Sequence, residues 1–475
     1  MLRELRKKLD NKEIGAKELC REYLDRIKQK DEKLNSFITV CEDYALKCAE
    51  EAQTAIDSGK SMPLSGIPVS IKDNICTKGI RTTCASKMLK DFVPPYDATA
   101  ADRLLKNGAV LLGKTNMDEF AMGSEGVNSY FNAVKNPYNP ELAAGGSSAG
   151  AAAAVSADLC VAALGSDTGG SVRLPAAFCG VVGLNPTYGR VSRYGLIAFA
   201  SSLDRIGVIS KTAGDAGYML GVISGADKKD ATCAKREDTD FLSLAGKSIA
   251  GMKIGIPKEF FAENVSDEIK NACMRAASFY ESNGAVLTEV SIPSLEYAVS
   301  AYYIISSAEA ASNLARYDGI KFGYCAENGT SFKDILSRSR TDGFAKEVKE
   351  RIMLGNYVLS GGYYDKYYKK AMAAKSAIKR EFDEIFEKCG FILTPTAPNL
   401  PQKAGRVCRP SEVYKNDIYT VISSIAGLPA ISVPCGFSER GMPIGMSLTG
   451  RAFDEKTIIA AADLFEKERG GKDTL

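Results

Sequence analysis

Three short polar segments of this 475-residue chain carry side chains suited to acyl transfer. Lys72 follows an apolar run, Ser147 and Ser148 lie in a GGSS segment, and Ser171 ends the segment GSDTGGS. A serine hydroxyl becomes a strong nucleophile when a neighbouring base takes its proton. Because lysine is that base in Ser–Lys enzymes, the three segments together predict a serine nucleophile activated by Lys72.

The segment 165–171 is the best candidate for the nucleophile loop. Its last residue is Ser171, and the two residues before Ser171 are glycines. Glycines leave their backbone N–H groups unobstructed, as an oxyanion hole requires. We therefore predict Ser171 as the nucleophile. The N–H groups predicted to hold the oxyanion belong to Thr168, Gly169, Gly170 and Ser171.

Lys72 and Ser147 each have an ordinary alternative interpretation. Lysine has a reference pKa of about 10.4 and acts as a base only when neutral, so burial or nearby positive charge must lower its pKa. The apolar run 64–71 favours burial of Lys72, although a surface lysine at a strand end has the same spacing. Ser147 precedes an alanine-rich segment and could instead cap a helix.

The chain contains no histidine. This absence excludes Ser-His-Asp and Cys-His catalysis and any zinc site with histidine ligands. Residues 146–150 match GxSxG, but that nucleophile elbow needs a histidine base, so Ser148 is not predicted to be such a nucleophile. Residues 108–115 match the phosphate-binding pattern GxxxxGK[ST], yet four apolar residues fill its centre. We interpret that stretch as a core strand.

Composition narrows the function classes and the compartment. The chain has 61 basic and 58 acidic residues, and this balance gives no argument for nucleic acid or membrane binding. Thirteen cysteines without a CxxC pair favour reduced thiols over a disulfide framework or a four-cysteine zinc site. The charged start is unlike a signal peptide, and residues 149–164 are too short to span a bilayer. We expect a cytoplasmic protein without a metal.

Predicted helices and strands alternate along the chain around these residues. This alternation predicts a single α/β domain over residues 1–475, with a mixed, mostly parallel sheet and helices on both faces. Residues 1–30 are expected to form one amphipathic helix, and residues 1–60 to pack outside a catalytic core of about 61–215. The remainder is expected to complete the sheet and the substrate pocket. Strands are expected at 64–71, 109–112, 253–256, 286–290, 391–393, 430–433 and 445–448, and helices at 44–58, 99–106 and 266–283, with a helical zone ending near Cys389.

Longer motifs surround the three polar segments. They are KNPYNPEL (135–142), LGSDTGGSVRLPAAFCGVVGLNPTYGRVSRYGL (164–196), SSLDRIGVISKT (201–212), GKTNMDEFAMGS (113–124), SNLARYDGIKFGY (312–324), RIMLGNYVLSGGYYDKYY (351–368) and AGLPAISVPCG (426–436). With them, the chain resembles the amidase signature family over nearly its whole length, and within it the glutamine-hydrolysing subunits of amidotransferases. It departs from the usual GGSSGG by Ala149, at a position expected to open a helix.

The resemblance implies a role for each site residue. Ser171 would form the acyl-enzyme, Ser147 would relay the proton after a cis peptide bond from Gly146, and Lys72 would be the base. Arg351 and Asp417 would hold the α-carboxylate and α-ammonium groups of glutamine, with Tyr302 and Ser124 as further candidates for this pocket. On sequence grounds alone, Arg351 and Asp417 could also be solvated side chains on helices.

The resemblance also implies partners. Ammonia would pass to a B subunit that uses ATP and Mg to convert Glu-tRNA(Gln) to Gln-tRNA(Gln), in a complex that also contains a small C subunit. No cofactor is expected in this chain. Two alternatives stay open: a stand-alone amidase for another carboxamide, and a catalytically silent scaffold in the complex.

Overall fold

The computed structural model describes residues 1–262, 265–406 and 410–469, without the side chains of 410–415 and 469. Over these residues the fold is built on an 11-stranded sheet with the order β1-β3-β2-β4-β6-β5-β10-β11-β9-β7-β8. The strands are β1 Phe37–Val40, β2 Pro68–Lys72, β3 Val110–Thr115, β4 Ala162–Asp167, β5 Val182–Asn185, β6 Arg205–Ser210, β7 Lys253–Pro257, β8 Val286–Val290, β9 Phe391–Pro395, β10 Ala430–Phe437 and β11 Pro443–Gly450.

The prediction of a mixed α/β sheet is confirmed, but the expected excess of parallel strands is wrong. Parallel pairing joins β2 to β3 and β4, and β7 to β8 and β9. The central strands β4, β6, β5, β10, β11 and β9 pair antiparallel. The connections from β5 to β6 and from β10 to β11 contain no α-helix. A parallel pair needs a long crossover, usually helical, so these neighbours pair antiparallel.

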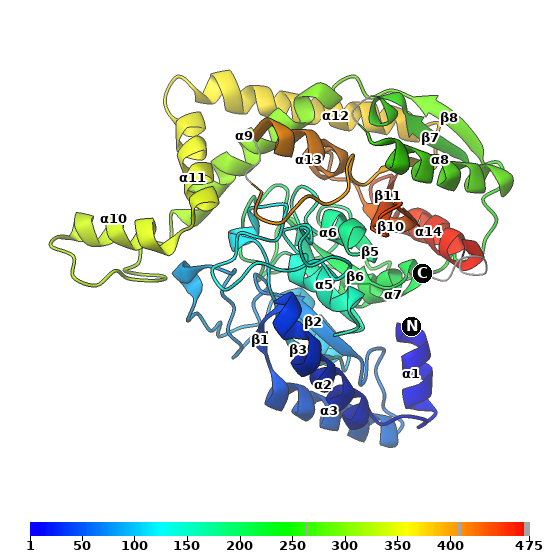
Figure 1. The fold of residues 1–475 in the computed structure, drawn as a ribbon, viewed down its shortest axis with the longest axis horizontal. Helices are drawn as coiled ribbons and strands as arrows, with labels where there is room; N and C mark the ends of the chain where they lie inside the picture. Colours follow the sequence, from blue (N-terminus) through cyan, green and yellow to red (C-terminus); the bar gives the residue numbers. More distant parts are fainter. Residues whose placement is uncertain (263–264, 407–409, 470–475) are drawn as a thin grey trace.

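Helices lie on both faces of the sheet, as expected (Figure 1). Helices α11, α12 and α13 each pack on α9, and the short helix α10 stands out from the body as an arm. The helices are α1 Leu2–Asp10, α2 Ala16–Leu34, α3 Glu42–Asp57, α4 Thr99–Lys106, α5 Ala149–Ser156, α6 Arg173–Phe178, α7 Ala213–Ile223, α8 Asp267–Ser282, α9 Leu295–Leu314, α10 Phe332–Gly343, α11 Lys346–Leu359, α12 Lys369–Phe386, α13 Pro410–Ile425 and α14 Glu455–Arg469.

The single helix expected over residues 1–30 is instead two helices, α1 and α2. The chain turns between them, where Lys12 has a φ of 58° and Gly15 is the N-cap of α2. A non-glycine residue with positive φ ends a right-handed helix. Apolar side chains of both helices are buried, including Leu2 and Leu9 of α1. The apolar pattern that predicted one helix therefore belongs to two separate helices.

Most other expected elements are present within a few residues, including α3, α4, α8 and strands β2, β3 and β7 to β11. The core-strand interpretation of residues 108–115 is confirmed. Lys114 is buried in β3 and donates to the Ile75 carbonyl at 2.7 Å and to Thr82 Oγ1 at 2.8 Å. Strands β1, β4, β5 and β6 were not predicted from the sequence. The division into residues 1–60, about 61–215 and a remainder stays a prediction.

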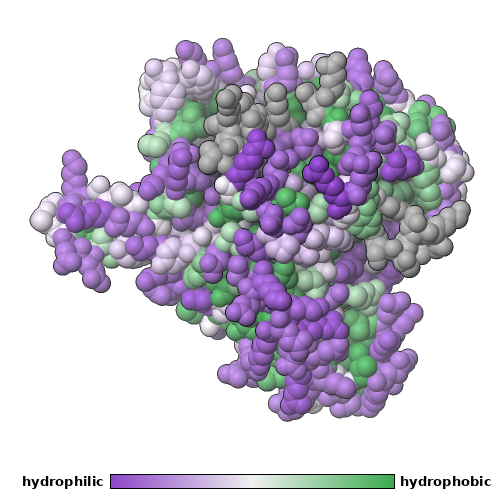
Figure 2. All heavy atoms as spheres, viewed as in Figure 1, coloured by the Kyte–Doolittle hydropathy of each residue, from purple (hydrophilic) through white to green (hydrophobic). Residues whose placement is uncertain are grey.

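The outer surface is largely polar. Figure 2 shows hydrophilic side chains over most of the visible face, with hydrophobic groups in smaller areas. None of the helices in the described part of the chain is long and apolar enough to cross a membrane.

Helices α9 and α11 approach closely at Gly355. A Cβ added there would overlap the carbonyl oxygen of Ser307 in α9. We expect Gly355→Ala to lower the free energy of unfolding by about 1–3 kcal/mol because a backbone group cannot move aside easily. Thermal melting measures this loss. Gly361→Ala is the control, since its added Cβ meets nothing within 4 Å; equal melting temperatures for the two variants would contradict the prediction.

Candidate active site

A cavity of about 540 Å³ opens where the glycine-rich loops meet helices α9, α11 and α13. Gly146, Gly169, Gly170 and Ser171 line it from the loops. Four predicted substrate residues line it as well: Ser124, Tyr302, Arg351 and Asp417. Segments far apart in the sequence therefore supply the predicted nucleophile and the predicted substrate groups to one space.

Lys72 lies at the end of β2 and is completely buried. Its Nζ donates to Ser147 Oγ and Ser148 Oγ, each at 2.8 Å, and to the Ser166 carbonyl at 3.2 Å. Ser148 Oγ donates onward to the same carbonyl at 3.1 Å. Lys72 is therefore fixed against Ser147. Ser148 supplies a second hydroxyl acceptor for the amine, and no role was predicted for Ser148 from the sequence.

Burial lowers the pKa of Lys72 to about 7, although the nearby carboxylates of Asp118 and Asp167 act in the opposite direction. Desolvation disfavours the ammonium form of an amine. A substantial fraction of Lys72 is then neutral at neutral pH. The amine thus meets the condition that the sequence analysis set for a general base.

The turn that carries Ser147 is held by close backbone packing. The Gly146–Ser147 peptide bond is cis, as the resemblance implied. A side chain at Gly146 would overlap a carboxylate oxygen of Asp118. Asp118 itself accepts from the N–H groups of Gly126 at 3.1 Å and Asn128 at 3.0 Å. The Ser148 N–H donates to the Ser171 carbonyl at 3.0 Å, which joins this turn to the nucleophile loop.

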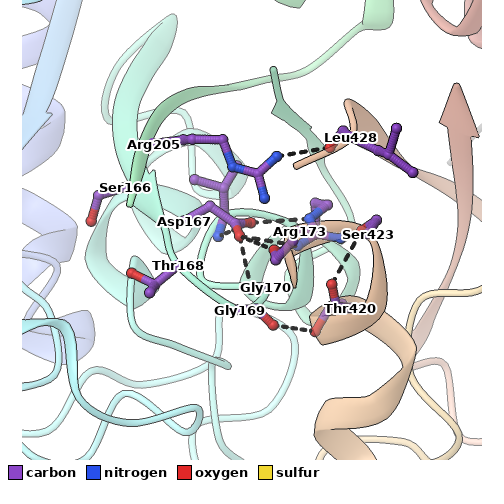
Figure 3. A network of polar contacts seen from close by, with 12 residues as sticks. Ser166, Asp167, Thr168, Gly169, Gly170, Arg173, Arg205, Thr420, Ser423 and Leu428 are labelled. Carbon is purple, nitrogen blue, oxygen red and sulfur yellow. Dashed lines mark hydrogen bonds and ion pairs between the residues drawn. The ribbon is translucent and has the colours of Figure 1, made fainter. Parts of the chain in front are cut away.

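A buried ion pair fixes the nucleophile loop (Figure 3). Arg173 donates from Nε to Asp167 Oδ2 and from Nη2 to Asp167 Oδ1, both at 3.0 Å. The same guanidinium donates to Ser423 Oγ at 2.6 Å and Ser424 Oγ at 2.7 Å in α13. No role was predicted from the sequence for either Asp167 or Arg173. Opposite charges six residues apart in an otherwise uncharged stretch were the available signal.

The charge pair also orients the loop's backbone. Burial alone would raise the pKa of Asp167, but Arg173 lowers it to about 2, so Asp167 is ionised. Asp167 accepts from the N–H groups of Gly170 at 2.8 Å and Val172 at 3.1 Å. An oxyanion role for the Gly170 N–H therefore requires this donor to be shared. Thr168 is buried and donates its hydroxyl to Asp204 Oδ1 at 2.7 Å.

Helices α9 and α13 pack directly against the nucleophile loop. Thr420 Oγ1 donates to the Gly169 carbonyl at 2.7 Å (Figure 3). A Cβ added at Gly169 would lie 2.6 Å from the Tyr302 ring, and one at Gly170 would overlap Thr420. These glycines are needed because α9 and α13 leave no room for side chains. Thr420 was missed because a threonine in a helix has no distinctive sequence context.

Arg351 and Asp417 are buried at the far side of the cavity, so their alternative as solvated side chains is wrong. Arg351 Nε donates to Glu347 Oε1 at 2.8 Å, and its buried Nη1 has no hydrogen-bond partner among the described residues. Burial raises the pKa of Asp417 to about 6. The cavity therefore offers a cation and a carboxylate to a ligand that carries both charges.

This arrangement can support acyl transfer without a metal or cofactor in the mechanism. Within the described residues, no group of three or more Cys, Asp or Glu side chains could hold a metal ion. The catalytic and substrate-binding roles of the individual residues stay predictions.

Sequence comparisons find relatives that are similar over nearly the whole chain. The A subunit of the glutamyl-tRNA(Gln) amidotransferase of Ruminiclostridium cellulolyticum is 54% identical, covering 99% of this chain and 97% of the relative. The same subunit from Caldanaerobacter subterraneus subsp. tengcongensis is 51% identical, with coverages of 98% and 95%.

Solved structures of two proteins with different names share the fold of this chain. The A subunit of the glutamyl-tRNA(Gln) amidotransferase of Thermotoga maritima has a TM-score of 0.80 and 42% identity, covering 95% of this chain and 91% of that one. The peptide amidase of Stenotrophomonas maltophilia has a TM-score of 0.81 at 28% identity, with coverages of 98% and 96%. A sequence profile of the family described as Amidase matches residues 18–459. The chain therefore belongs to the amidase family.

Proposed function

We propose that this chain is the glutamine-hydrolysing subunit of a glutamyl-tRNA(Gln) amidotransferase. The observation that carries this proposal is the high identity, over nearly the full length, to relatives bearing that name. The cavity supports it, because a buried Arg351 and Asp417 suit the two charged ends of an α-amino acid.

In the proposed reaction, Ser171 Oγ attacks the side-chain amide carbon of glutamine. Its proton passes through Ser147 to neutral Lys72, whose Nζ lies 2.8 Å from Ser147 Oγ and accepts the proton on its lone pair. Backbone N–H groups of the nucleophile loop hold the oxyanion. As the tetrahedral intermediate collapses, the proton returns through Ser147 to the leaving nitrogen, and ammonia departs. Water then cleaves the glutamyl ester by the same relay.

Ammonia would pass to a partner. We propose a B subunit that binds ATP and Mg and amidates Glu-tRNA(Gln), together with a C subunit. The even charge balance of this chain supports placing the main tRNA contacts on a partner. A cytoplasmic location follows from the same proposal.

Replacing Ser171 by alanine tests the activity. We expect ammonia release from glutamine by the natively purified complex to fall at least about 10³-fold, because the nucleophile is lost. Release by the unmodified complex should rise with ATP and Glu-tRNA(Gln). Release that is indifferent to both, or faster with another carboxamide, would indicate a stand-alone amidase. Unchanged release in Ser171→Ala would reject the predicted nucleophile.

Activity should depend on pH through Lys72. Its lowered pKa of about 7 means that the neutral base is lost as pH falls, so kcat should decrease below about pH 7. Asp417, with a pKa of about 6, should lose its charge at lower pH and raise KM. Rates between about pH 5.5 and 9 measure both effects. In Asp417→Asn, KM should no longer rise at low pH, while kcat should still decrease there. A kcat that does not change with pH would contradict the role of Lys72.

The two charged cavity residues should control glutamine binding. We expect Arg351→Lys and Asp417→Asn each to raise KM for glutamine about 10-fold or more, because each loses charge-assisted hydrogen bonds. Initial-rate kinetics measure the change. Arg338→Lys is a matched control, since Arg338 is exposed in α10 and pairs with Asp334. Unchanged KM in both cavity variants would exclude this binding mode.

A further inference from the structure

Tyr303 lies between the two charged residues of the cavity and has no role in the mechanism above. It follows Tyr302 in α9, lines the cavity and is buried. Its hydroxyl donates to Asp417 Oδ2 at 2.6 Å. The Arg351 guanidinium carbon lies over the Tyr303 ring, 4.2 Å from its centre. One side chain therefore contacts both groups through different parts of its surface.

The positions of Arg351 and Asp417 need an explanation. Opposite charges in a buried cavity attract strongly and tend to pair directly. The described residues nevertheless show no ion pair between them: Arg351 Nε donates to Glu347, and Arg351 Nη1 has no partner. If these two groups paired with each other, a ligand would have to break that contact before either group could bind it.

We propose that Tyr303 is a positioning residue that keeps these opposite charges apart and thereby selects zwitterionic amides. Its ring supports the guanidinium by a cation–π contact, and its hydroxyl occupies one oxygen of Asp417. Arg351 then presents its guanidinium to a carboxylate, and the other oxygen of Asp417 faces an ammonium group. The inference deepens the proposed function and rests on it, since the ligand is an α-amino acid with a side-chain amide.

The test compares three substrates with the full-length chain and its co-purifying proteins. Glutamine carries both charged groups, 4-carbamoylbutanoate lacks the ammonium group, and 4-aminobutanamide lacks the carboxylate. Tyr303→Phe keeps the ring under Arg351 but removes the hydrogen bond to Asp417. We expect its KM to rise about 10-fold for glutamine and 4-aminobutanamide, and less than about 2-fold for 4-carbamoylbutanoate. Its kcat for glutamine should change less than about 3-fold, because the loss of this hydrogen bond should weaken binding of the ground state and of the transition state equally.

A second variant separates the ring from the hydroxyl. Tyr303→Leu removes both contacts, so Arg351 can turn to Asp417. We expect it to raise KM for 4-carbamoylbutanoate about 10-fold as well. Tyr280→Phe is the matched control: Tyr280 is also buried and donates to a carbonyl, that of Ala461, in a different part of the fold. Its kinetics should match those of the unmodified chain for all three substrates.

Failure of the proposed role of Tyr303 and failure of the proposed function give different results. If the unmodified chain releases no ammonia from glutamine, both proposals fail. If glutamine is cleaved normally but Tyr303→Phe affects all three amides equally, Tyr303 is only structural and the inference fails. An unchanged KM for glutamine in Tyr303→Phe overturns it too. Melting temperatures of the variants show whether folding, rather than binding, has changed.

Discussion

One buried lysine determines which polar groups the surrounding structure must supply. Lys72 sits at the end of β2 with no solvent contact, and its amine is held by two serine hydroxyls and one carbonyl. An isolated ammonium group in such a place would be very costly, and the chain responds with a pKa of about 7 and a full set of acceptors. A group that can be neutral at physiological pH is what a lysine base requires.

The nucleophile loop contains a buried group that, unlike Lys72, stays charged. Asp167 is equally buried but stays ionised because Arg173 binds it through two hydrogen bonds. That guanidinium also reaches Ser423 and Ser424 of α13, a helix that contributes Asp417 to the cavity. The same ion pair therefore shapes the loop around Ser171 and joins it to the substrate side. Removing either partner would leave a buried charge without compensation, so both ends of the site would be affected.

The substrate side is built by helices whose order in the chain gives no hint of their proximity. Tyr303 of α9, Arg351 of α11 and Asp417 of α13 meet around one cavity. Gly355 allows α11 to approach α9 closely enough for this contact. The spacing between a cation and a carboxylate, and therefore which ligand charges fit, follows from that helix packing.

Local sequence patterns were enough to predict the chemical possibilities and much of the local structure. The absence of histidine, the glycines before Ser171 and the apolar run before Lys72 led to a serine–lysine site, and local patterns located most strands and helices. The antiparallel pairing of the central strands, the two helices in residues 1–30 and the burial of Arg351 and Asp417 became visible only in the folded chain. Hydropathy and turn residues act over a few positions and can be recognised locally. Burial, pKa and the approach of distant charges depend on contacts between segments that lie far apart in the sequence, and these exist only once the chain has packed.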